Sequence, residues 1–431
     1  MGMSMMKGKA TFFLLLLLPV FFSVGYAREE ERGERGRGEI FLLQHSKQVF
    51  QTDAGQMRVV RGLRTKGVES PMHIGFITME PNTFFIPQYI DSNLIIFVHE
   101  GEGKIGRISH GRQLEEGQLK VGDVYRIPAG SAFYLMNNGK DQRLQIICGI
   151  DTSESIQSGL FQSFFIGGGS YPRSVLRGFD QTTLAAAFNV SSSELEDILI
   201  GQEGGPIIFV KDADHLDRWT STWTELLKSE YRHRGVPSTT ASYSLYDRKP
   251  DFKNNYGWSV AVDEEDFSAL RHSGIGVYYV NLTAGSMMAP HVNPTATEYG
   301  VVLRGSGLIE VVFPNGTTAM TAEVDEGDVF WVPRYFPFCQ TASMIGPMEF
   351  FGFTTSARKN RPQFLVGASS ILHTMSGPEL ATAFDVSEER LQKLIDAQRE
   401  SIILPSTPAV PENTQQQQAN NGRRNLGFNY S

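Results

Sequence analysis

The stretch from Gly285 to Cys339 decides the fold. It begins G-S-M-M-A-P-H-V-N-P-T-A-T-E-Y-G-V-V-L-R-G-S-G, passes through strand patterns on either side of a turn at residues 314–316, and ends G-D-V-F-W-V-P-R-Y-F-P-F-C. Short apolar runs divided by glycine and proline are typical of small β-barrels. His291 and Asn293 are two residues apart, so their side chains point the same way on a strand. With Glu298, which opens the next strand pattern, they would converge inside such a barrel.

Several residues of this stretch resemble the motifs of the cupin family. The first cupin motif, a glycine, His-x-His, a glutamate and a closing glycine, is matched by Gly285, His291, Glu298 and Gly305. Asn293 replaces its second histidine. The second motif opens with Gly-Asp and a proline, which are matched by Gly327, Asp328 and Pro333. Tyr335 and Phe338 replace the glycine and the histidine that follow. The resemblance therefore implies a cupin barrel whose metal-ligand set is incomplete.

The core of the chain contains this pattern twice. Residues 122–128, G-D-V-Y-R-I-P, repeat residues 327–333, G-D-V-F-W-V-P. After each half, a helical segment recurs, L-A-A-A-F-N-V-S at 184–191 and L-A-T-A-F-D-V-S at 380–387. The serine that ends each segment is a predicted helix N-cap. Strands followed by helices, in two copies, predict an all-β dominated fold with two tandem barrels (cupin or jelly-roll type), each followed by a small helical extension.

Short apolar segments separated by turns predict the strands. They cover Ile74–Met79, Leu94–His99, Val124–Ile127, Leu144–Cys148, Val277–Leu282, Val301–Leu303, Leu308–Phe313, Val329–Val332 and Glu349–Phe353. Several of these segments are apolar on both faces. That pattern suits strands buried between a barrel lumen and a second layer.

The two ends of the chain differ in composition from this core. A positive start, an apolar run over residues 12–24 and small residues at Gly25 and Ala27 predict a secretory signal peptide at 1–27. An arm of Arg, Glu and Gly follows at 28–39. The predicted parts after it are a first barrel with a helical pair at 40–228, a second at 229–404, and a disordered Gln/Asn/Pro tail at 405–431.

Composition excludes some partners. The formal net charge of −8 argues against nucleic acid or an anionic membrane as the main partner. After the signal peptide no run reaches ~18 apolar residues, so no membrane span is expected once it is cleaved. Cys148 and Cys339 lie one in each half, too far apart to pair by expectation, and are predicted to be free, buried thiols.

With both halves in view, the chain resembles a plant vicilin-like 7S seed storage globulin, which is a bicupin. The signal peptide, the duplicated unit and F-F-G-F-T-T-S-A-R-K-N-R-P-Q-F-L at 350–365 carry the resemblance, which spans about residues 40–404. It implies a nutrient reservoir that travels the secretory pathway to the protein storage vacuole, or to the cell exterior. It also implies a homotrimer in which each helical pair clasps a neighbouring subunit. A reservoir needs no active site, so neither catalysis nor a cofactor is expected.

The second barrel keeps a metal site open as an alternative. His291, Glu298 and Cys339 could bind a copper or zinc ion, because imidazole and thiolate suit both metals. The resemblance adds that some vicilins hold copper through Cys and His side chains in this barrel. Against a metal site, Phe338 and not Cys339 stands where the second cupin motif has its histidine, and neighbouring residues on a strand face opposite ways. The alternatives are a metal-binding bicupin with residual oxidoreductase-type activity, or a bicupin that binds a small molecule.

The first barrel has no comparable ligand set. By register, the positions of the histidine, asparagine and glutamate of the second barrel are taken by Pro87, Tyr89 and Leu94. Phe133 stands at the position of Phe338. We therefore predict an apolar barrel that holds a small molecule or nothing.

Sequons predict sites of N-glycosylation. The candidates are Asn315, Asn281 and Asn189, with a further sequon at Asn429. Asn315 lies in a predicted turn and is the strongest candidate. Asn281 ends a predicted strand, Asn189 lies between helices, and Asn429 is close to the C-terminus.

Overall fold

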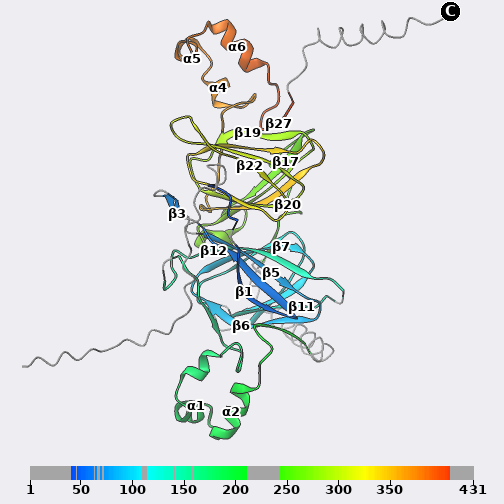
Figure 1. Ribbon diagram of the computed structural model, residues 1–431, viewed down its shortest axis with the longest axis vertical. Helices are drawn as coiled ribbons and strands as arrows, with labels where there is room; N and C mark the ends of the chain where they lie inside the picture. The colour runs from blue at the N-terminus through cyan, green and yellow to red at the C-terminus, as the bar shows by residue number, and fades with distance from the viewer. Residues whose placement is uncertain are drawn as a thin grey trace, which may run out of the picture. The chain divides into compact units, whose positions relative to one another are not determined.

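The computed structural model describes residues 40–44, 46–62, 64–65, 68–69, 72–108, 114–139, 141–157, 159–210 and 242–407. The predicted signal peptide, the charged arm, the boundary near residue 229 and residues 408–431 of the predicted tail lie outside this part. Within it, two β-barrels follow one another, each with its own helices (Figure 1). The predicted fold class is confirmed.

The first barrel consists of two sheets that enclose one core. One sheet has the order β1-β2-β5-β12-β7-β10-β15, the other β13-β6-β11-β8-β9, with β14 also paired to β6. The bounds are β1 Ser46–Thr52, β2 Gly55–Val60, β5 Met72–Met79, β6 Thr83–Ile90, β7 Asn93–Glu100, β8 Gly103–Ile108, β9 Leu114–Leu119, β10 Asp123–Ile127, β11 Phe133–Asn137, β12 Leu144–Asp151, β13 Ser163–Phe165, β14 Ile207–Phe209 and β15 Ser242–Ser244. Strands β3 (Arg64–Thr65) and β4 (Val68–Glu69) form a separate pair. Buried side chains from both sheets, such as Ile96 and Ile105, belong to one apolar cluster, which we call the first lumen.

The second barrel repeats this strand order. Its sheets are β16-β17-β18-β25-β20-β23 and β22-β21-β24-β19-β26, with β27 also paired to β19. The bounds are β16 Phe252–Asn254, β17 Gly257–Val262, β18 Gly276–Leu282, β19 Ser286–Val292, β20 Glu298–Arg304, β21 Gly307–Val312, β22 Thr318–Val324, β23 Val329–Val332, β24 Pro337–Ala342, β25 Met348–Thr354, β26 Gln363–Phe364 and β27 Ile403–Pro405. The order β17-β18-β25-β20-β23 matches β2-β5-β12-β7-β10, so the predicted duplication is confirmed. Pro405, the first residue of the predicted tail, is still in this sheet and pairs with Ser286.

The predicted apolar segments coincide with β5, β7, β10, β12, β18, β20, β21, β23 and β25. Strands β6 and β19 are not among the predicted apolar segments, although His291 was expected to lie on a strand. Each contains an internal proline, Pro87 or Pro290. The structure accommodates both prolines at a break in the pairing with β11 or β24. Such bulges are where a sheet tolerates a residue without a backbone N–H.

The helices follow their barrels as predicted. They are η1 Val175–Gly178, α1 Gln181–Phe188 and α2 Ser192–Ile200 in the first half, and α4 Ile371–Thr374, α5 Pro378–Ala383 and α6 Glu388–Asp396 in the second. A further short helix, η2 Ser268–His272, lies within the second barrel between β17 and β18. Ser191 Oγ accepts the Glu194 N–H, and Ser387 Oγ accepts the Arg390 N–H, so both predicted N-caps are confirmed. Leu195 in α2 is buried, as is its counterpart in α6, and these side chains anchor the last helix of each half.

Each half supplies a short segment to the other half's sheet. In the second barrel, Leu42 bridges Phe330, and the Leu43 N–H donates to the Val329 carbonyl at 2.8 Å. In the first barrel, β15 from the second half pairs with β10. Strands β10 and β23 hold equivalent places at the ends of their repeated orders. Covering them satisfies backbone groups that an edge strand would leave unpaired.

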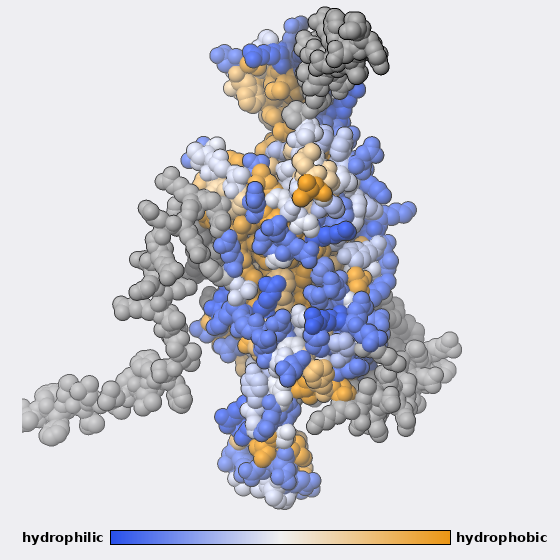
Figure 2. All heavy atoms as spheres, turned by 45° about the vertical axis from the view of Figure 1, so that its right-hand side comes forward, coloured by the Kyte–Doolittle hydropathy of each residue, from blue (hydrophilic) through white to orange (hydrophobic). Residues whose placement is uncertain are grey.

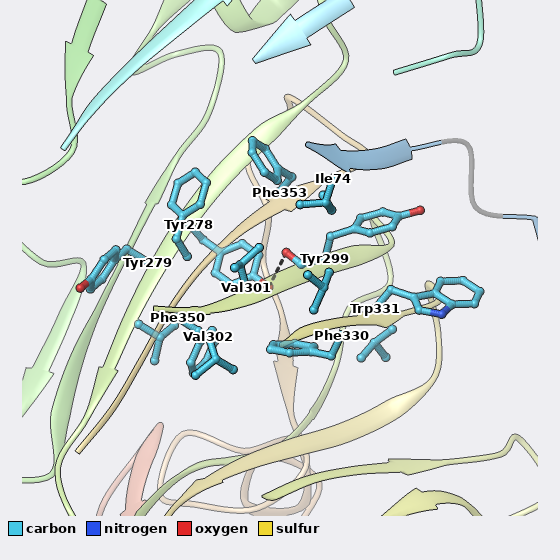
Figure 3. Close-up of a cluster of buried hydrophobic side chains, with 14 of the residues drawn as sticks. Ile74, Tyr278, Tyr279, Tyr299, Val301, Val302, Phe330, Trp331, Phe350 and Phe353 are labelled. Atoms are coloured by element: carbon cyan, nitrogen blue, oxygen red, sulfur yellow. Dashed lines mark hydrogen bonds between the residues drawn. The ribbon is translucent and has the colours of Figure 1, made fainter. Parts of the chain in front are cut away.

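A shared apolar cluster joins the two barrels. The rings of Phe97 in β7 and Phe351 in β25 stack with centroids 3.9 Å apart. Figure 3 shows Ile74 of the first half close to Phe353 of the second, within a cluster in which the Tyr278 hydroxyl donates to the Tyr299 carbonyl at 3.1 Å. The sheets that contain these residues are thus buried on both faces, which explains their continuous apolar sequences.

Candidate functional site

The predicted cluster of the second barrel lies at the junction of β19 and β20. His291, Asn293 and Glu298 are 3%, 2% and 5% exposed. Asn293 Nδ2 donates to Glu298 Oε1 at 2.6 Å, and Asn293 Oδ1 accepts the backbone N–H groups of Thr295 and Ala296 at 3.0 Å. Asparagine commonly closes a turn in this way. Asn293 therefore builds the connection between the strands and at the same time holds the Glu298 carboxyl.

His291 is a neutral, packed side chain. Its Nδ1 lies 2.7 Å from the Ala289 carbonyl, a contact that requires a proton on Nδ1. The ring contacts Phe338 and Phe364, with centroid distances of 4.1 and 5.2 Å. Burial lowers the pKa of His291 to about 4, although the bond to Ala289 acts in the opposite direction. The imidazole is thus uncharged at neutral pH.

Glu298 shares its carboxyl with three neighbours. Burial raises its pKa to about 7, and hydrogen bonds with Asn293, Asn360 and Tyr278 limit the rise. The carboxyl therefore holds a proton in mild acid and ionises close to neutrality. The arrangement is a closed polar cluster inside an apolar barrel.

The third predicted ligand, Cys339, lies on the other face of β24. Phe338 pairs with His291, whereas Cys339 pairs with Glu310 and its Sγ lies 3.5 Å from Glu310 Oε2. Successive residues of a strand point to opposite faces, so the thiol does not join the imidazole. Burial and the neighbouring carboxylate raise the pKa of Cys339 to about 12. Both cysteines are free and buried, as predicted.

These donors do not fit a copper or zinc site as the side chains stand. Among the described residues no group of three or more His, Cys, Asp or Glu side chains is placed to hold one metal ion. The position nearest the imidazole is filled by the Phe338 ring, and the carboxyl of Glu298 is engaged by its neighbours. A ligand set would require rearrangement of β24.

The predicted counterpart of His291 in the first barrel was wrong by one residue, whereas that of Glu298 is confirmed, because Leu94 pairs with Ile127 just as Glu298 pairs with Val332. Gln88, not Pro87, pairs with Phe133, just as His291 pairs with Phe338. Gln88 is therefore the counterpart of His291. Aligning the internal prolines, I-P-Q-Y-I with A-P-H-V-N, would have found it. The conclusion that no metal-ligand set occupies these positions is unaffected, because the corrected residue is an amide.

Tyr335, which replaces a motif glycine, has a left-handed backbone. Its φ is 76°, and its side chain is 58% exposed. Because a side chain in this region costs ~1 kcal/mol relative to glycine, we expect Tyr335→Gly to raise the free energy of unfolding by about 0.5–1 kcal/mol. Urea denaturation would measure the change. The variant Tyr335→Ala is the control, because it keeps the backbone strain and removes only the ring, which lies under the Arg334 guanidinium. If Tyr335→Ala raised the free energy of unfolding as much as Tyr335→Gly, backbone strain would not be the explanation.

Glu298 and His291 give the stability opposite pH dependences. The folded pKa of Glu298, about 7, exceeds the ordinary 4.5, so the folded state holds the extra proton and stability falls as pH rises from 4.5 to 7. The folded pKa of His291, about 4, lies below 6.5, so the unfolded state holds the extra proton and stability rises between pH 4 and 6.5. The two effects offset each other in the range they share.

We therefore expect Glu298→Gln to expose the histidine's dependence. Glutamine retains an acceptor for Asn293 and does not titrate. The free energy of unfolding of this variant should rise by about 2 kcal/mol from about pH 5 to 6.5, at ~1.4 kcal/mol per unit. Urea denaturation across this range tests it, with His291→Gln as the matched variant of opposite slope. Parallel profiles for the two variants would refute the assignment.

The sequons lie in different surroundings. Asn315 is exposed in the turn between β21 and β22, where its Oδ1 accepts from Thr317. Asn189 is exposed and caps α1 with a φ of 56°. Asn281 is half-buried in β18, which is paired on both sides. Glycosylation at each stays a prediction, and Asn429 lies outside the described residues.

Known proteins match the chain in sequence. The cupin family profile matches residues 41–196 and 243–392. A vicilin-like seed storage protein of Arabidopsis thaliana is 49% identical over 422 residues, which cover 87% of this chain and 82% of that protein. A 63 kDa globulin-like protein of Oryza sativa subsp. japonica is 27% identical over 431 residues, which cover 87% of this chain and 75% of that protein.

Solved structures match the fold. The vicilin from Corylus avellana has a TM-score of 0.74 at 24% identity, covering 85% of this chain and 99% of that chain. The vicilin from Capsicum annuum has a TM-score of 0.75 at 24% identity, covering 85% and 100%. The resemblance stated from the motifs is confirmed by both kinds of comparison. The chain belongs to the cupin family and, within it, to the vicilin-like seed storage proteins.

Proposed function

We propose that the protein is a seed storage protein, a nutrient reservoir, and that neither barrel catalyses a reaction. The observation that carries this proposal is the engagement of the polar groups in the second barrel. His291 bonds to the main chain and packs against Phe338, while Glu298 bonds to Asn293. Polar groups used in this way stabilise a barrel but offer a substrate little to bind. The relative from Arabidopsis thaliana carries the storage description.

The test of a storage role is the behaviour of the protein in seeds. Quantitative mass spectrometry should find it among the abundant proteins of mature seed, and it should disappear during germination. A constant low level in seed and seedling would contradict the proposal.

In the same samples, sequencing the N-terminus should find a start near Arg28, as predicted for a cleaved signal peptide. Immunolocalisation should place it in the storage vacuole and not outside the cell. Among the described residues no helix is long and apolar enough to cross a bilayer.

Self-association is proposed through the helical segments. Leu394 in α6 is 72% exposed and its counterpart Ile198 in α2 is 67% exposed. Phe384 and Phe188 form a second equivalent pair, 55% and 53% exposed. Figure 2 shows hydrophobic side chains on the surface of both helical segments. Two apolar surfaces on one chain suit a head-to-tail contact that closes into a ring, and a homotrimer is the ring that the family implies.

A charge on this surface tests the trimer. We expect Leu394→Asp to shift the sedimenting species from trimer to monomer, because a carboxylate would be buried against the apolar surface of the neighbour. Lys393→Asp, the adjacent exposed residue of the same helix, introduces the same side chain and should leave the trimer intact. Analytical ultracentrifugation distinguishes the two outcomes. A trimer that survives the Leu394 change would place the contact elsewhere.

The metal-binding alternative with His291, Glu298 and Cys339 stays a prediction that elemental analysis tests. Stoichiometric copper or zinc in purified protein, lost in His291→Ala, would favour it over an inert barrel. The structure favours the inert barrel, because it separates the thiol from the imidazole. N-glycosylation is tested in the same preparation by the mass lost on Asn315→Gln.

A further inference from the structure

An asparagine followed by a glycine is chemically labile, and the described part of the chain contains this pair twice. The pairs are Asn315–Gly316, in the turn between β21 and β22, and Asn138–Gly139, in the turn between β11 and β12. The backbone nitrogen of the glycine attacks the side-chain amide carbon of the asparagine, and glycine has no side chain to hinder that approach. How readily a pair reacts depends on how its turn holds the two atoms.

The Asn315 side chain is folded back over the peptide bond that follows it. Its Oδ1 accepts the Thr317 N–H at 3.1 Å and the Thr317 hydroxyl at 2.7 Å. The first of these bonds reaches the backbone two residues on and so closes an Asx turn. The ring closed in this way contains both the amide carbon of Asn315 and the backbone nitrogen of Gly316. It therefore holds the two reacting atoms close together.

The two donors of Thr317 also lie where negative charge would develop. As the Gly316 nitrogen adds to the amide carbon, electrons of the C=O bond move onto Oδ1 of Asn315. Donors that already point at such an oxygen stabilise the transition state. The hydroxyl is the closer of the two donors, at 2.7 Å. Thr317 thus supplies the kind of hydrogen bonding that an oxyanion requires.

The turn leaves room for the reaction. Residues 315–317 are exposed, and a Cβ added to Gly316 would meet no atom within 4 Å beyond its chain neighbours. The Gly316 N–H donates to the Phe313 carbonyl at 2.9 Å, and this bond has to open during the attack. A second bond, from the Phe313 N–H to the Thr317 carbonyl at 2.8 Å, keeps the hairpin closed meanwhile. Water reaches the exposed turn and can hydrolyse the product.

The Asn138–Gly139 pair is held differently. The Gly139 N–H donates to Oδ1 of Asn137 at 3.0 Å, and Asn137 is 1% exposed. The Nδ2 of Asn137 donates to three backbone carbonyls, those of Met79, Glu80 and Gln142. The attacking nitrogen is thus bound to a buried, anchored amide. The Asn138 side chain receives no hydrogen bond from any residue that the structure describes.

We propose that Asn315 is a site of spontaneous deamidation, which proceeds through a cyclic imide formed with Gly316. The Gly316 nitrogen bonds to the Asn315 amide carbon and loses its proton, while the bond from that carbon to Nδ2 breaks and ammonia leaves with the proton. Water then adds to either carbonyl of the imide and opens the ring, which gives aspartate or isoaspartate. Water is the only other reactant. The proposal goes beyond storage and does not depend on it.

The reaction competes with the N-glycosylation predicted for the same residue, because both use Nδ2 of Asn315. Full-length protein made in a bacterial host that does not glycosylate sequons removes this competition. In such protein, kept folded at neutral pH, peptide mass spectrometry should find Asn315 converted to aspartate and isoaspartate at least about fivefold faster than Asn138. In urea that unfolds the chain, the two rates should become similar, because the difference stems from the fold.

Variants at Thr317 test the part of the argument that concerns its hydroxyl. Thr317→Val should slow the conversion of Asn315 about fivefold, the effect of losing one hydrogen bond. Thr317→Ser keeps the hydroxyl and should react like the unchanged protein. Both changes lie in an exposed turn, so the fold should be retained.

Three results would each overturn the proposal. The first is an absence of conversion at Asn315 in the folded protein while the unfolded chain reacts. The second is a rate at Asn138 that equals or exceeds the rate at Asn315. The third is a rate that Thr317→Val leaves unchanged. Asn315→Gln is the blank for the mass measurement, because its longer side chain would have to close a larger ring.

Discussion

Replacing Gly305 by alanine is expected to lower the free energy of unfolding by about 2–5 kcal/mol, since strain and overpacking add. Gly305 closes the first cupin motif with a φ of 78°, a backbone conformation that side chains avoid. A Cβ at this position would also collide with the carbonyl oxygen of Pro347. That oxygen belongs to the main chain and cannot turn away like a flexible side chain. Urea denaturation of the two proteins measures the difference.

Gly327, which opens the second motif, is the matched control. Its φ is 92°, and a Cβ there would have nothing within 4 Å. Gly327→Ala should therefore cost only the conformational strain, about 1–2 kcal/mol. A loss at Gly305 no larger than at Gly327 would show that the contact with Pro347 relaxes freely.

Truncating Phe351 is expected to destabilise the protein by about 3–5 kcal/mol, the cost of emptying a large buried ring position. The ring is fully buried and stacks on Phe97 of the other barrel. Phe351→Ala therefore removes packing inside the second half and contact between the halves together. Chemical denaturation followed by tryptophan fluorescence should show the loss in both the midpoint and the fitted free energy.

Ile345→Ala provides the comparison for apolar truncation at the surface. Ile345 is 93% exposed, so this change should stay within ±0.5 kcal/mol, as surface substitutions usually do. If Phe351→Ala costs no more than this, the contact between the barrels contributes little to stability. If instead the unfolding curve of Phe351→Ala separates into two steps, the halves unfold independently once the stack is lost.

The sequence predicts the repeated barrels because local signals recur at equal spacing. The G-D-V pattern at 122–124 and 327–329 marks the same strand start in each half, and the serines before α2 and α6 mark the same helix start. Each signal depends on a few neighbouring residues, so it can be recognised in the sequence before the rest of the fold is known. The covering of β10 and β23 by segments from the other half was not predicted. Pairings of this kind are non-local, and segments as short as 41–43 carry no pattern of their own.

The candidate site was predicted in part for the same reason. The meeting of His291, Asn293 and Glu298 follows from strand alternation and a turn, both of which are local. The counterpart of His291 in the first barrel was missed because the connection after it is one residue shorter there: Gln88 lies six residues before Leu94, whereas His291 lies seven residues before Glu298. A shift of one residue on a strand reverses which side chains point inward. Gln88 and Arg107, nineteen residues apart in the chain, become neighbours of Phe133 only through pairings that the sequence does not display.

The exchange of short strand segments between the two halves affects how proteases can break the protein down. Leu42 and Leu43 precede the first barrel in the chain but pair with β23 of the second barrel. Ser242–Ser244 belong to the second half but pair with β10 of the first barrel. A single cleavage between Val210 and Ser242 would therefore give two fragments that stay associated, because each fragment contributes a strand segment to the barrel of the other. Breakdown of the reserve then needs unfolding or many cleavages, and one scission alone would leave the particle whole.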